Sequence, residues 1–239
     1  MINVCLIGYG AWGKKVFYSL KKIKKINKIY LIKNRREKED FKLGDVDWVF
    51  VTTNISNHYK IVLKFLKKKI NVFCEKPLTK NYNNDIILYK IAKKNNCKLY
   101  VSDIENFKVK KIKLIKKNLI LRSKYSYDKK NIIERLAYHD FTYLYAFIKN
   151  KNPKSIRIIK NKKGELNLSI KFDNKLFILK YNLNIHQKKH SFNNVNLTTK
   201  KNILKKMLLK VIQNKVNFSK NKKISLFASR ISKKINERI

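Results

Sequence analysis

Up to about residue 102, short apolar runs alternate with longer lysine-rich stretches. The runs are rich in β-branched and aromatic residues, which is typical of strands. The predicted strands are Ile2–Ile7, Lys28–Ile32, Trp48–Thr52, Asn71–Cys74 and Lys98–Ser102. The predicted helices, where apolar residues recur three and four positions apart, are Trp12–Ile23, Ser56–Lys68 and Tyr82–Asn95. Strands and helices that alternate in this way predict βαβ units around a parallel sheet that is buried on both faces.

From about residue 103 the pattern changes. A broad apolar face predicts a helix over Ile132–Lys149, and apolar and polar residues then alternate with a period of two. The runs with this alternation are Ser155–Lys160, Glu165–Phe172 and Leu176–Leu183, separated by the turns Lys162-Lys163-Gly164 and Asp173-Asn174-Lys175. Such turns between alternating runs predict an antiparallel sheet. Helical spacing returns at Asn202–Gln213 and Ser225–Ile235. We therefore predict two domains, residues 1–102 and 103–239.

The chain carries 59 basic and 15 acidic residues, so its formal charge is +44. A hydrophobic fraction of 44% is enough for a buried core and argues against disorder. Seven of the basic residues are arginines and the rest are lysines, which recur in every segment. Proteins that bind nucleic acid typically gather basic residues in a patch and use arginine for bidentate contacts. We therefore attribute the charge to overall composition and do not expect nucleic acid as a partner.

The cysteines bear on the compartment. Cys5, Cys74 and Cys97 are odd in number and form no CxxC spacing, so they indicate neither a disulfide framework nor a zinc site. No apolar stretch approaches the roughly 20 residues of a membrane span, and no basic region precedes the first apolar run. These observations predict a cytoplasmic protein in a reducing environment, without a membrane segment.

A glycine motif, Gly8-Tyr9-Gly10-Ala11-Trp12-Gly13, closes the first predicted strand and opens the first helix. In such a motif the first glycine permits the tight turn, the second lets backbone N–H groups approach a pyrophosphate, and the third lets the helix pack on the strand. In its strand–turn–helix context the motif predicts a dinucleotide site that includes Ala11 and Trp12. A glycine turn without a ligand is the alternative interpretation.

The segment after the second strand bears on the type of cofactor. An acidic residue about 20 positions after the glycine turn usually binds the adenosine ribose. Here the segment is Lys33-Asn34-Arg35-Arg36 instead. Because no carboxylate is present to repel a 2′-phosphate and Arg35 or Arg36 could pair with one, the segment predicts NADP rather than NAD, with Asn34 and Arg35 as cofactor-binding residues. Ordinary loop charges, with NAD as the cofactor, are the alternative.

Three further segments carry a resemblance. Thr53-Asn54 follows an apolar strand, His58-Tyr59 comes at the start of the next helix, and Cys74-Glu75-Lys76-Pro77-Leu78 ends the fourth strand. This order resembles the Gfo/Idh/MocA oxidoreductase family, whose typical sequence pattern is a strand ending in Thr-Pro, a His-Tyr pair and a Cys-Glu-Lys-Pro-Leu segment. Asn54 replaces the usual proline. The resemblance extends in outline over the whole chain, including the helix, hairpins and helices after residue 102.

The resemblance implies an α/β fold, with an N-terminal Rossmann domain and a reduced C-terminal α+β domain. The mostly antiparallel sheet of the second domain would support the substrate site and often forms a homo-oligomer interface. The implied reaction is hydride transfer between nicotinamide and a sugar, nucleotide sugar or similar polyol. The residues implied to line the cofactor cleft are Thr53, Asn54, His58, Glu75 and Lys76. Lys76 would exchange the hydroxyl proton, since a desolvated ammonium releases a proton readily; an ordinary surface lysine is the alternative.

The family's second catalytic position is a histidine on a helix of the second domain, often in a His-Asp-hydroxyl run. His139-Asp140 with Thr142 matches that run, and imidazole exchanges protons near neutral pH. Many relatives carry an aspartate four residues earlier, where this chain has Arg135. A structural helix histidine is the alternative for His139. His186 and His190 lie in a lysine-rich segment without metal-ligand neighbours, so we assign them no role and expect no metal.

Two shortenings also distinguish the chain. Few residues separate Ile32 from Asp47, and the segment after Leu183 is also short, so we expect an abbreviated adenine side and a reduced second sheet. These shortenings, together with Arg135, motivate a second hypothesis, a non-catalytic NAD(P)-binding regulatory module. A nucleic-acid-binding protein, motivated by charge alone, is the third.

Overall fold

The structure is a computed structural model that describes residues 1–33, 42–108, 111–198 and 202–239. The chain divides into two compact units. Unit 1 comprises Met1–Ile104 and Asn202–Leu226, and unit 2 comprises Glu105–Lys201 and Phe227–Ile239. Across the described ranges, none of the helices has the length and apolar character needed to cross a membrane.

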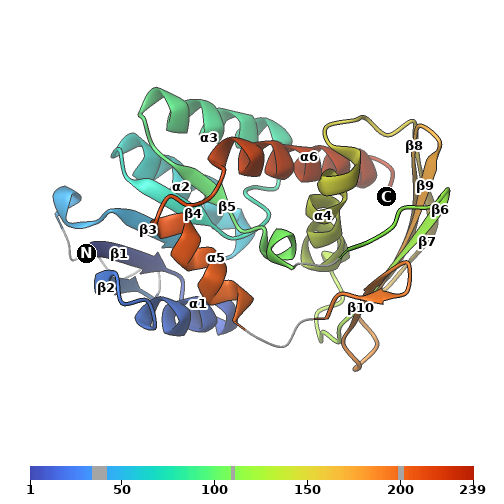
Figure 1. Ribbon diagram of the computed structural model, residues 1–239, viewed down its shortest axis with the longest axis horizontal. Coiled ribbons are helices and arrows are strands. Elements are labelled where there is room, and N and C mark those ends of the chain that lie inside the picture. The colour runs from blue at the N-terminus through green and yellow to red at the C-terminus, as the bar shows by residue number, and fades with distance from the viewer. Residues whose placement is uncertain (34–41, 109–110, 199–201) are drawn as a thin grey trace. The chain divides into compact units, whose positions relative to one another are not determined.

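Unit 1 is built on a five-stranded parallel sheet in the order β2-β1-β3-β4-β5 (Figure 1). Its strands are β1 (Ile2–Ile7), β2 (Ile26–Ile32), β3 (Trp48–Val51), β4 (Asn71–Cys74) and β5 (Leu99–Val101). Ile7 pairs with Ile32 on one side and with Val51 on the other, so the carboxyl ends of the strands lie along one edge. The predicted parallel α/β sheet is confirmed. Its strand order reverses at β1, and doubly wound sheets bind ligands at such a reversal.

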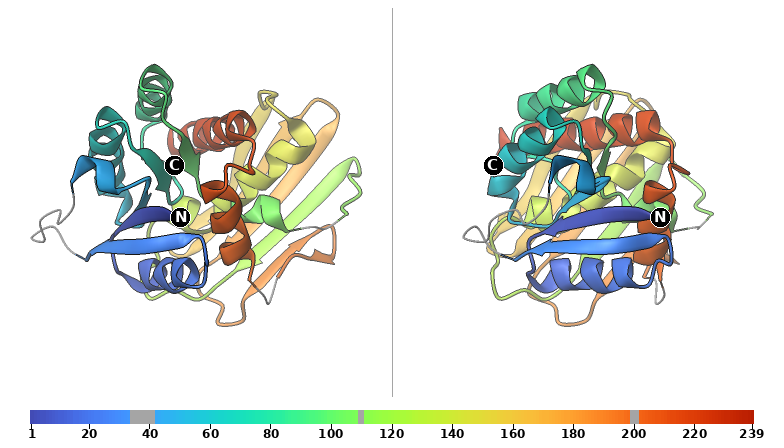
Figure 2. Two further views of the ribbon diagram at one scale, coloured as in Figure 1. Left: turned by 60° about the vertical axis from the view of Figure 1, so that its left-hand side comes forward. Right: turned by 90° about the vertical axis from the view of Figure 1, so that its left-hand side faces the viewer.

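Helices cover both faces of this sheet (Figure 2). The helices of unit 1 are α1 (Ala11–Lys21), α2 (Ile55–Lys67), α3 (Tyr82–Lys94), α5 (Ile203–Ile212) and the first part of α6 (Phe218–Asn236), with a short 3-10 turn η1 at Leu43–Asp45. Alternate strand residues such as Val49 and Val72 join Phe65 of α2 and Leu88 of α3 in one apolar cluster. Helices α1 and α5 pack against each other. The apolar stripes of the predicted helices therefore cover the sheet as the sequence pattern indicates.

Residues Asn202–Leu226 return to unit 1, which the predicted boundary at residue 102 did not anticipate. The ring of Phe218 stacks on Trp48 of β3 with centroids 6.2 Å apart. The Asn221 side chain accepts from the N–H of Val101 and donates to its C=O, both at 2.9 Å, so the amide pairs with the strand β5 as a neighbouring strand would. Helix α6 accordingly begins at Phe218 and not at Ser225, because these early residues also have partners on the sheet.

Unit 2 contains a six-stranded sheet in the order β11-β10-β6-β9-β8-β7. Its strands are β6 (Lys117–Ser123), β7 (Ser155–Lys162), β8 (Glu165–Phe172), β9 (Lys175–Asn182), β10 (Lys189–Phe192) and β11 (Val195–Asn196). Only the β6–β9 pair is parallel among the described strands of this sheet, so the mostly antiparallel prediction is confirmed. Strands β6, β10 and β11 were not predicted, because lysine, asparagine and serine interrupt their alternation.

One helical segment packs on one face of the second sheet. The predicted helix over Ile132–Lys149 consists of a π-helical turn, Ile133–Ala137, followed by α4, Tyr138–Ile148. Phe141 and Leu144 of α4 join sheet residues such as Phe172, and Ile231 from the last part of α6, in the core of unit 2. A 3-10 turn, η2 (Ile104–Phe107), lies where unit 2 begins.

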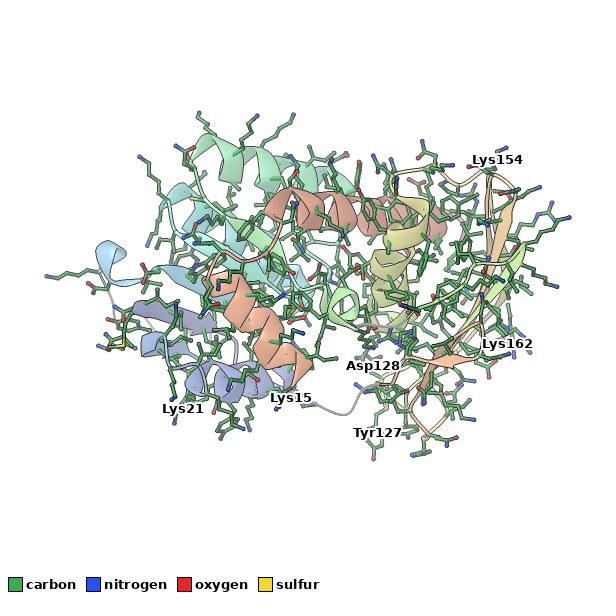
Figure 3. The ribbon with its side chains drawn as sticks, viewed as in Figure 1. Lys15, Lys21, Tyr127, Asp128, Lys154 and Lys162 are labelled. Carbon is green, nitrogen blue, oxygen red and sulfur yellow. The ribbon has the colours of Figure 1, made fainter. Side chains whose placement is uncertain are left out.

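The charge is spread over the surface, as expected from composition. Figure 3 shows lysine side chains directed outward from elements of both units, among them Lys15 and Lys21 on α1 and Lys154 and Lys162 at the two ends of β7. All four are exposed. The structure therefore distributes basic side chains over unrelated elements of both units.

Candidate functional site

The glycine turn between β1 and α1 requires glycine at two positions. Gly8 adopts a φ of +98°, which residues with a side chain rarely adopt. A Cβ at Gly13 would lie 2.1 Å from the carbonyl oxygen of Gly8, far inside van der Waals contact. Thr52 holds that carbonyl in place, since its hydroxyl donates to the Gly8 oxygen at 2.7 Å. The turn is thus closed against the strand and the helix, with no room for side chains at these positions.

Gly10 has the opposite surroundings. A Cβ there would meet no atom within 4 Å, so the turn leaves open space at this position. Gly10 is also the N-cap of α1, and no side chain caps the helix. Backbone N–H groups at a helix N-terminus carry partial positive charge and bind phosphate oxygens. The space and the uncapped N–H groups fit the pyrophosphate of a dinucleotide.

A cavity of about 890 Å³ lies beside this turn. Gly8, Gly10, Thr53 and Asn54 line it, which brings together four of the predicted cofactor residues from the ends of β1 and β3. Its volume is within the range of about 300–1,000 Å³ that is usual for ligand pockets. The remaining part of the glycine motif, Ala11-Trp12-Gly13, forms the first turn of α1 beyond that lining.

Three lysines also line this cavity. Lys33 follows β2, and Lys60 and Lys64 lie one helical turn apart on α2; all three line the cavity. Sequence analysis did not single out the two helix lysines, although their spacing of four on the polar face of α2 was a readable signal. The predicted Asn34 and Arg35 lie outside the described residues.

His58 does not line the cavity. Its ring is buried and bridges two carbonyl groups, with Nδ1 3.0 Å from the Pro77 oxygen and Nε2 3.0 Å from the Thr53 oxygen. Burial lowers the pKa of His58, although the hydrogen bonds to Pro77 and Thr53 oppose that shift. His58 thus joins the loop after β3 to the loop after β4.

Glu75 and Lys76 follow β4 at the same edge of the sheet, where the Glu75 N–H donates to the Val51 carbonyl at 2.9 Å. The Glu75 carboxyl is buried, and Lys76 is half-buried and joined to Pro77 by a cis peptide bond. Burial raises the pKa of Glu75, while a hydrogen bond from Trp12 and the charge of Lys76 act against the rise. Glu75 therefore connects the first turn of α1 to the lysine next to it.

In unit 2, His139 lies at the edge of a buried charged cluster, where 20% of its side chain is exposed. The cluster consists of Glu105, Lys108, Arg122, Asp140 and His190. Glu105 lies on the turn η2 and Lys108 directly follows that turn, while Arg122 is on β6, Asp140 on α4 and His190 on β10. Arg122 donates to Asp140 at 3.0 Å and to Glu105 at 2.8 Å. Nε2 of His190 lies 2.8 Å from Asp140.

Sequence analysis did not find most of this cluster. His190 was assigned no role, but strand β10, which was not predicted, places it inside unit 2. Glu105 and Arg122 carried no motif, and only the pairing of distant elements brings them together. Asp140 of the His-Asp pair turns into the cluster and is fully buried. Burial opposes ionisation of Asp140, but His190 and Arg122 outweigh it and hold its pKa below its ordinary value.

Arg135 lies on the π-helical turn before His139, with 41% of its side chain exposed. Its guanidinium donates to Asp128 at 2.5 Å and to the Ser126 hydroxyl at 2.8 Å. The residue that departs from the usual aspartate thus forms an ion pair at the surface of unit 2. Among the described residues, no group of histidine, cysteine and acidic side chains has the arrangement of a metal site.

Comparison with known proteins places this geometry in context. Residues 21–103 match the family described as "Oxidoreductase family, NAD-binding Rossmann fold". No curated protein matches the sequence. Among solved structures, UDP-N-acetylglucosamine 3-dehydrogenase GnnA from Acidithiobacillus ferrooxidans is similar with a TM-score of 0.83 and 13% identity, over 100% of this chain and 97% of that one.

Two further solved structures share the fold. The dehydrogenase MviM from Clostridium difficile has a TM-score of 0.79 and 15% identity, with 100% of this chain and 99% of that one covered. The WlbA (WbpB) dehydrogenase from Thermus thermophilus, in complex with NAD and UDP-GlcNAcA, has a TM-score of 0.76 and 9% identity, with 97% and 95% covered. At these identities the likeness shows the fold, including both units.

Proposed function

We propose that the chain is an NADP-dependent dehydrogenase or reductase of a carbohydrate-type substrate, and the match of residues 21–103 to the NAD-binding oxidoreductase family supports this proposal. The observation that carries the proposal is the glycine turn at Gly8–Gly13, which opens onto a cavity where the strand order reverses. When bound, the nicotinamide accepts or supplies the hydride. The protein's own residues supply binding, orientation and proton exchange.

The cofactor is held, in this proposal, by the edge of the sheet in unit 1. The N–H groups at the start of α1 and the space at Gly10 receive the pyrophosphate. Thr53 and Asn54 line the cavity beside it, and the Thr53 carbonyl is held by its contact with Nε2 of His58 at 3.0 Å. Asn54 is itself fixed because it caps α2, where its side chain accepts from the Ser56 N–H at 3.2 Å. These contacts hold the loop before any ligand arrives, so little ordering is required on binding.

We assign the preference for NADP to the three lysines that line the cavity. Lys33 directly follows β2, at whose end the adenosine ribose binds in doubly wound folds, and Lys60 and Lys64 of α2 line the same cavity. An added phosphate gains charge-assisted hydrogen bonds from ammonium groups there. Replacement of Lys60 by Gln should weaken NADPH binding about tenfold and leave NADH binding nearly unchanged. Titration with each nucleotide measures the two affinities, and an equal loss for both would refute the assignment.

Lys76 is the proposed acid–base group of unit 1. The half-buried position beside Glu75 keeps its ammonium at the edge where β4 ends, in the row that contains the glycine turn and Thr53. As a hydroxyl-bearing carbon is oxidised, its hydroxyl proton must leave; Lys76 accepts that proton in its neutral amine form and becomes the ammonium. His139 of unit 2 is the second proposed proton-exchanging group, because part of its imidazole is exposed while the rest of its cluster is buried.

The proposed substrate class follows from the similar structures. One is a UDP-N-acetylglucosamine 3-dehydrogenase, and another was solved with NAD and UDP-GlcNAcA. We therefore propose a sugar or nucleotide sugar as the substrate of this chain. Association of two chains through the second sheet stays a prediction.

Turnover with a panel of sugars and nucleotide sugars tests the function. With NADP⁺ or NADPH present, the absorbance of reduced nicotinamide should change for at least one substrate, and Lys76→Met should abolish that change while NADPH binding persists. Lys80→Met is the matched control, because Lys80 is exposed in the same segment. Cofactor binding without turnover on any substrate would instead support the non-catalytic binding module.

A further inference from the structure

Glu105 is the member of the buried cluster that faces His139. Its Oε1 atom lies 3.8 Å from Nδ1 of His139 and accepts from Arg122 at 2.8 Å. Its Oε2 atom lies 2.5 Å from Nζ of Lys108 and 3.7 Å from Nδ1 of His190. The Glu105 side chain is 2% exposed, so its carboxylate meets these four groups in a protected interior.

Glu105 is an anion at neutral pH. Burial opposes its ionisation, but Arg122 and Lys108 outweigh burial and hold the pKa of Glu105 below its ordinary value. Asp140 is paired in the same way with Arg122. The two carboxylates and the two cations therefore balance before either histidine gains a proton. A further positive charge on His139 is favoured by the nearest carboxylate and opposed by the two cations.

Two hydroxyl groups and one distant cation complete these surroundings. Burial raises the pKa values of Tyr143 and Tyr181, so both phenols stay neutral next to the cluster. Arg135 is directed to Asp128 at the surface, where its charge is paired. The carboxylate that faces the imidazole of His139 thus comes from the turn η2 and not from the preceding turn of its own helix.

We propose that Glu105 is a positioning residue for His139: its carboxylate, 3.8 Å from Nδ1, attracts the proton to that nitrogen and so keeps the Nε2 lone pair available for a substrate proton. The inference rests on the proposed function and adds an acidic residue that sequence analysis did not single out. In the proton step, the substrate hydroxyl loses its proton to Nε2, and the imidazolium that forms is stabilised by Glu105. No proton leaves Glu105 in this step.

The first test uses the wild-type protein. Proton–nitrogen spectra of histidine-labelled protein, with the His139 signal assigned through His139→Gln, show which ring nitrogen carries the proton in the neutral imidazole. The inference predicts the Nδ1–H tautomer for His139. The Nε2–H tautomer would overturn it. This measurement needs neither cofactor nor substrate, so it is independent of whether the protein is an active dehydrogenase.

The second test changes the charge. Glu105→Gln keeps the shape of the side chain but removes the anion, so the pH midpoint of the His139 titration should fall by about one unit or more. Glu237→Gln is the matched control, since Glu237 is exposed and forms an ion pair with Lys233 at the surface. An unchanged His139 midpoint in folded Glu105→Gln protein would overturn the inference. If that variant does not fold, the wild-type tautomer alone decides.

Kinetics separate this inference from the proposed function. In an active enzyme, Glu105→Gln should lower kcat at least tenfold, shift its pH profile with the His139 midpoint, and leave NADPH binding unchanged. A shifted His139 midpoint in a protein that turns over no substrate would keep the positioning role and refute the dehydrogenase. An active enzyme whose pH profile is the same in wild type and Glu105→Gln would support the dehydrogenase and refute the positioning role.

Discussion

Two glycines of one turn should respond to the same substitution in opposite ways. Gly13→Ala places a methyl group 2.1 Å from the Gly8 oxygen and 2.9 Å from the Thr52 hydroxyl. Gly10→Ala places the same methyl group in open space, at a φ of −69° that alanine adopts freely. The first substitution therefore perturbs the fold, and the second perturbs only the space that we assign to the pyrophosphate.

The magnitudes follow from these contacts. Overpacking in a tight site costs about 1–3 kcal/mol, and the Gly13 contact belongs at the upper end because the Gly8 carbonyl is held by Thr52 at 2.7 Å. The better helix propensity of alanine returns up to about 1 kcal/mol, which leaves a net loss of about 2 kcal/mol. Gly10→Ala loses under about 1 kcal/mol as a poorer N-cap, but it should weaken NADPH binding at least tenfold.

Urea denaturation of each variant, followed by circular dichroism, gives the free energies of unfolding. NADPH fluorescence titrations of the folded proteins give the affinities. We expect Gly13→Ala to lose stability and Gly10→Ala to lose affinity. A Gly13→Ala protein as stable as the wild type would refute the packing argument, and unchanged NADPH affinity in Gly10→Ala would refute the placement of the pyrophosphate.

Three further predictions concern buried polar groups. Burial raises the pKa of Asp103 to about 6, against an ordinary value of 3.8, so the folded state binds this proton more tightly than the unfolded state. The free energy of unfolding should therefore fall by about 2 kcal/mol between pH 4 and pH 6. Asp103→Asn should remove that decline in denaturation curves recorded across this range. Asn221→Ala leaves the Val101 N–H and C=O without the amide, and it should cost at least about 2 kcal/mol, measured by urea denaturation; a loss within error would contradict the pairing. Arg122→Met leaves two buried carboxylates without their shared cation and should cost about 3–5 kcal/mol, whereas a loss below about 1 kcal/mol would show that the cluster tolerates the charge.

The fold of unit 1 could be predicted because its signals are local. The apolar runs that form β1, β3 and β4 are continuous, and the stripes on α1 and α2 have helical spacing. The glycine motif could also be interpreted from the sequence, because the positive φ of Gly8 and the close packing of Gly13 both require glycine. Four predicted residues, Gly8, Gly10, Thr53 and Asn54, accordingly lie together on one cavity wall.

The remainder depends on contacts between distant segments. Asn221 is an unremarkable polar residue in the sequence, and only its pairing with Val101 shows why the chain returns to unit 1. Glu105 and His190 are brought together by η2 and β10, neither of which has a clear periodic pattern. Elements as short as η2 and β10 give no clear periodicity of apolar residues in the sequence. The charged cluster that they bring together could therefore not be predicted.

The central claim is that the turn and cavity of unit 1 bind a phosphorylated nicotinamide dinucleotide. Isothermal titration of the wild-type protein with NADPH, beside NADH, tests it most directly. We predict saturable binding of one NADPH per chain, at least tenfold tighter than NADH and weakened in Gly10→Ala. Absence of saturable binding by either nucleotide to the folded protein would contradict the claim.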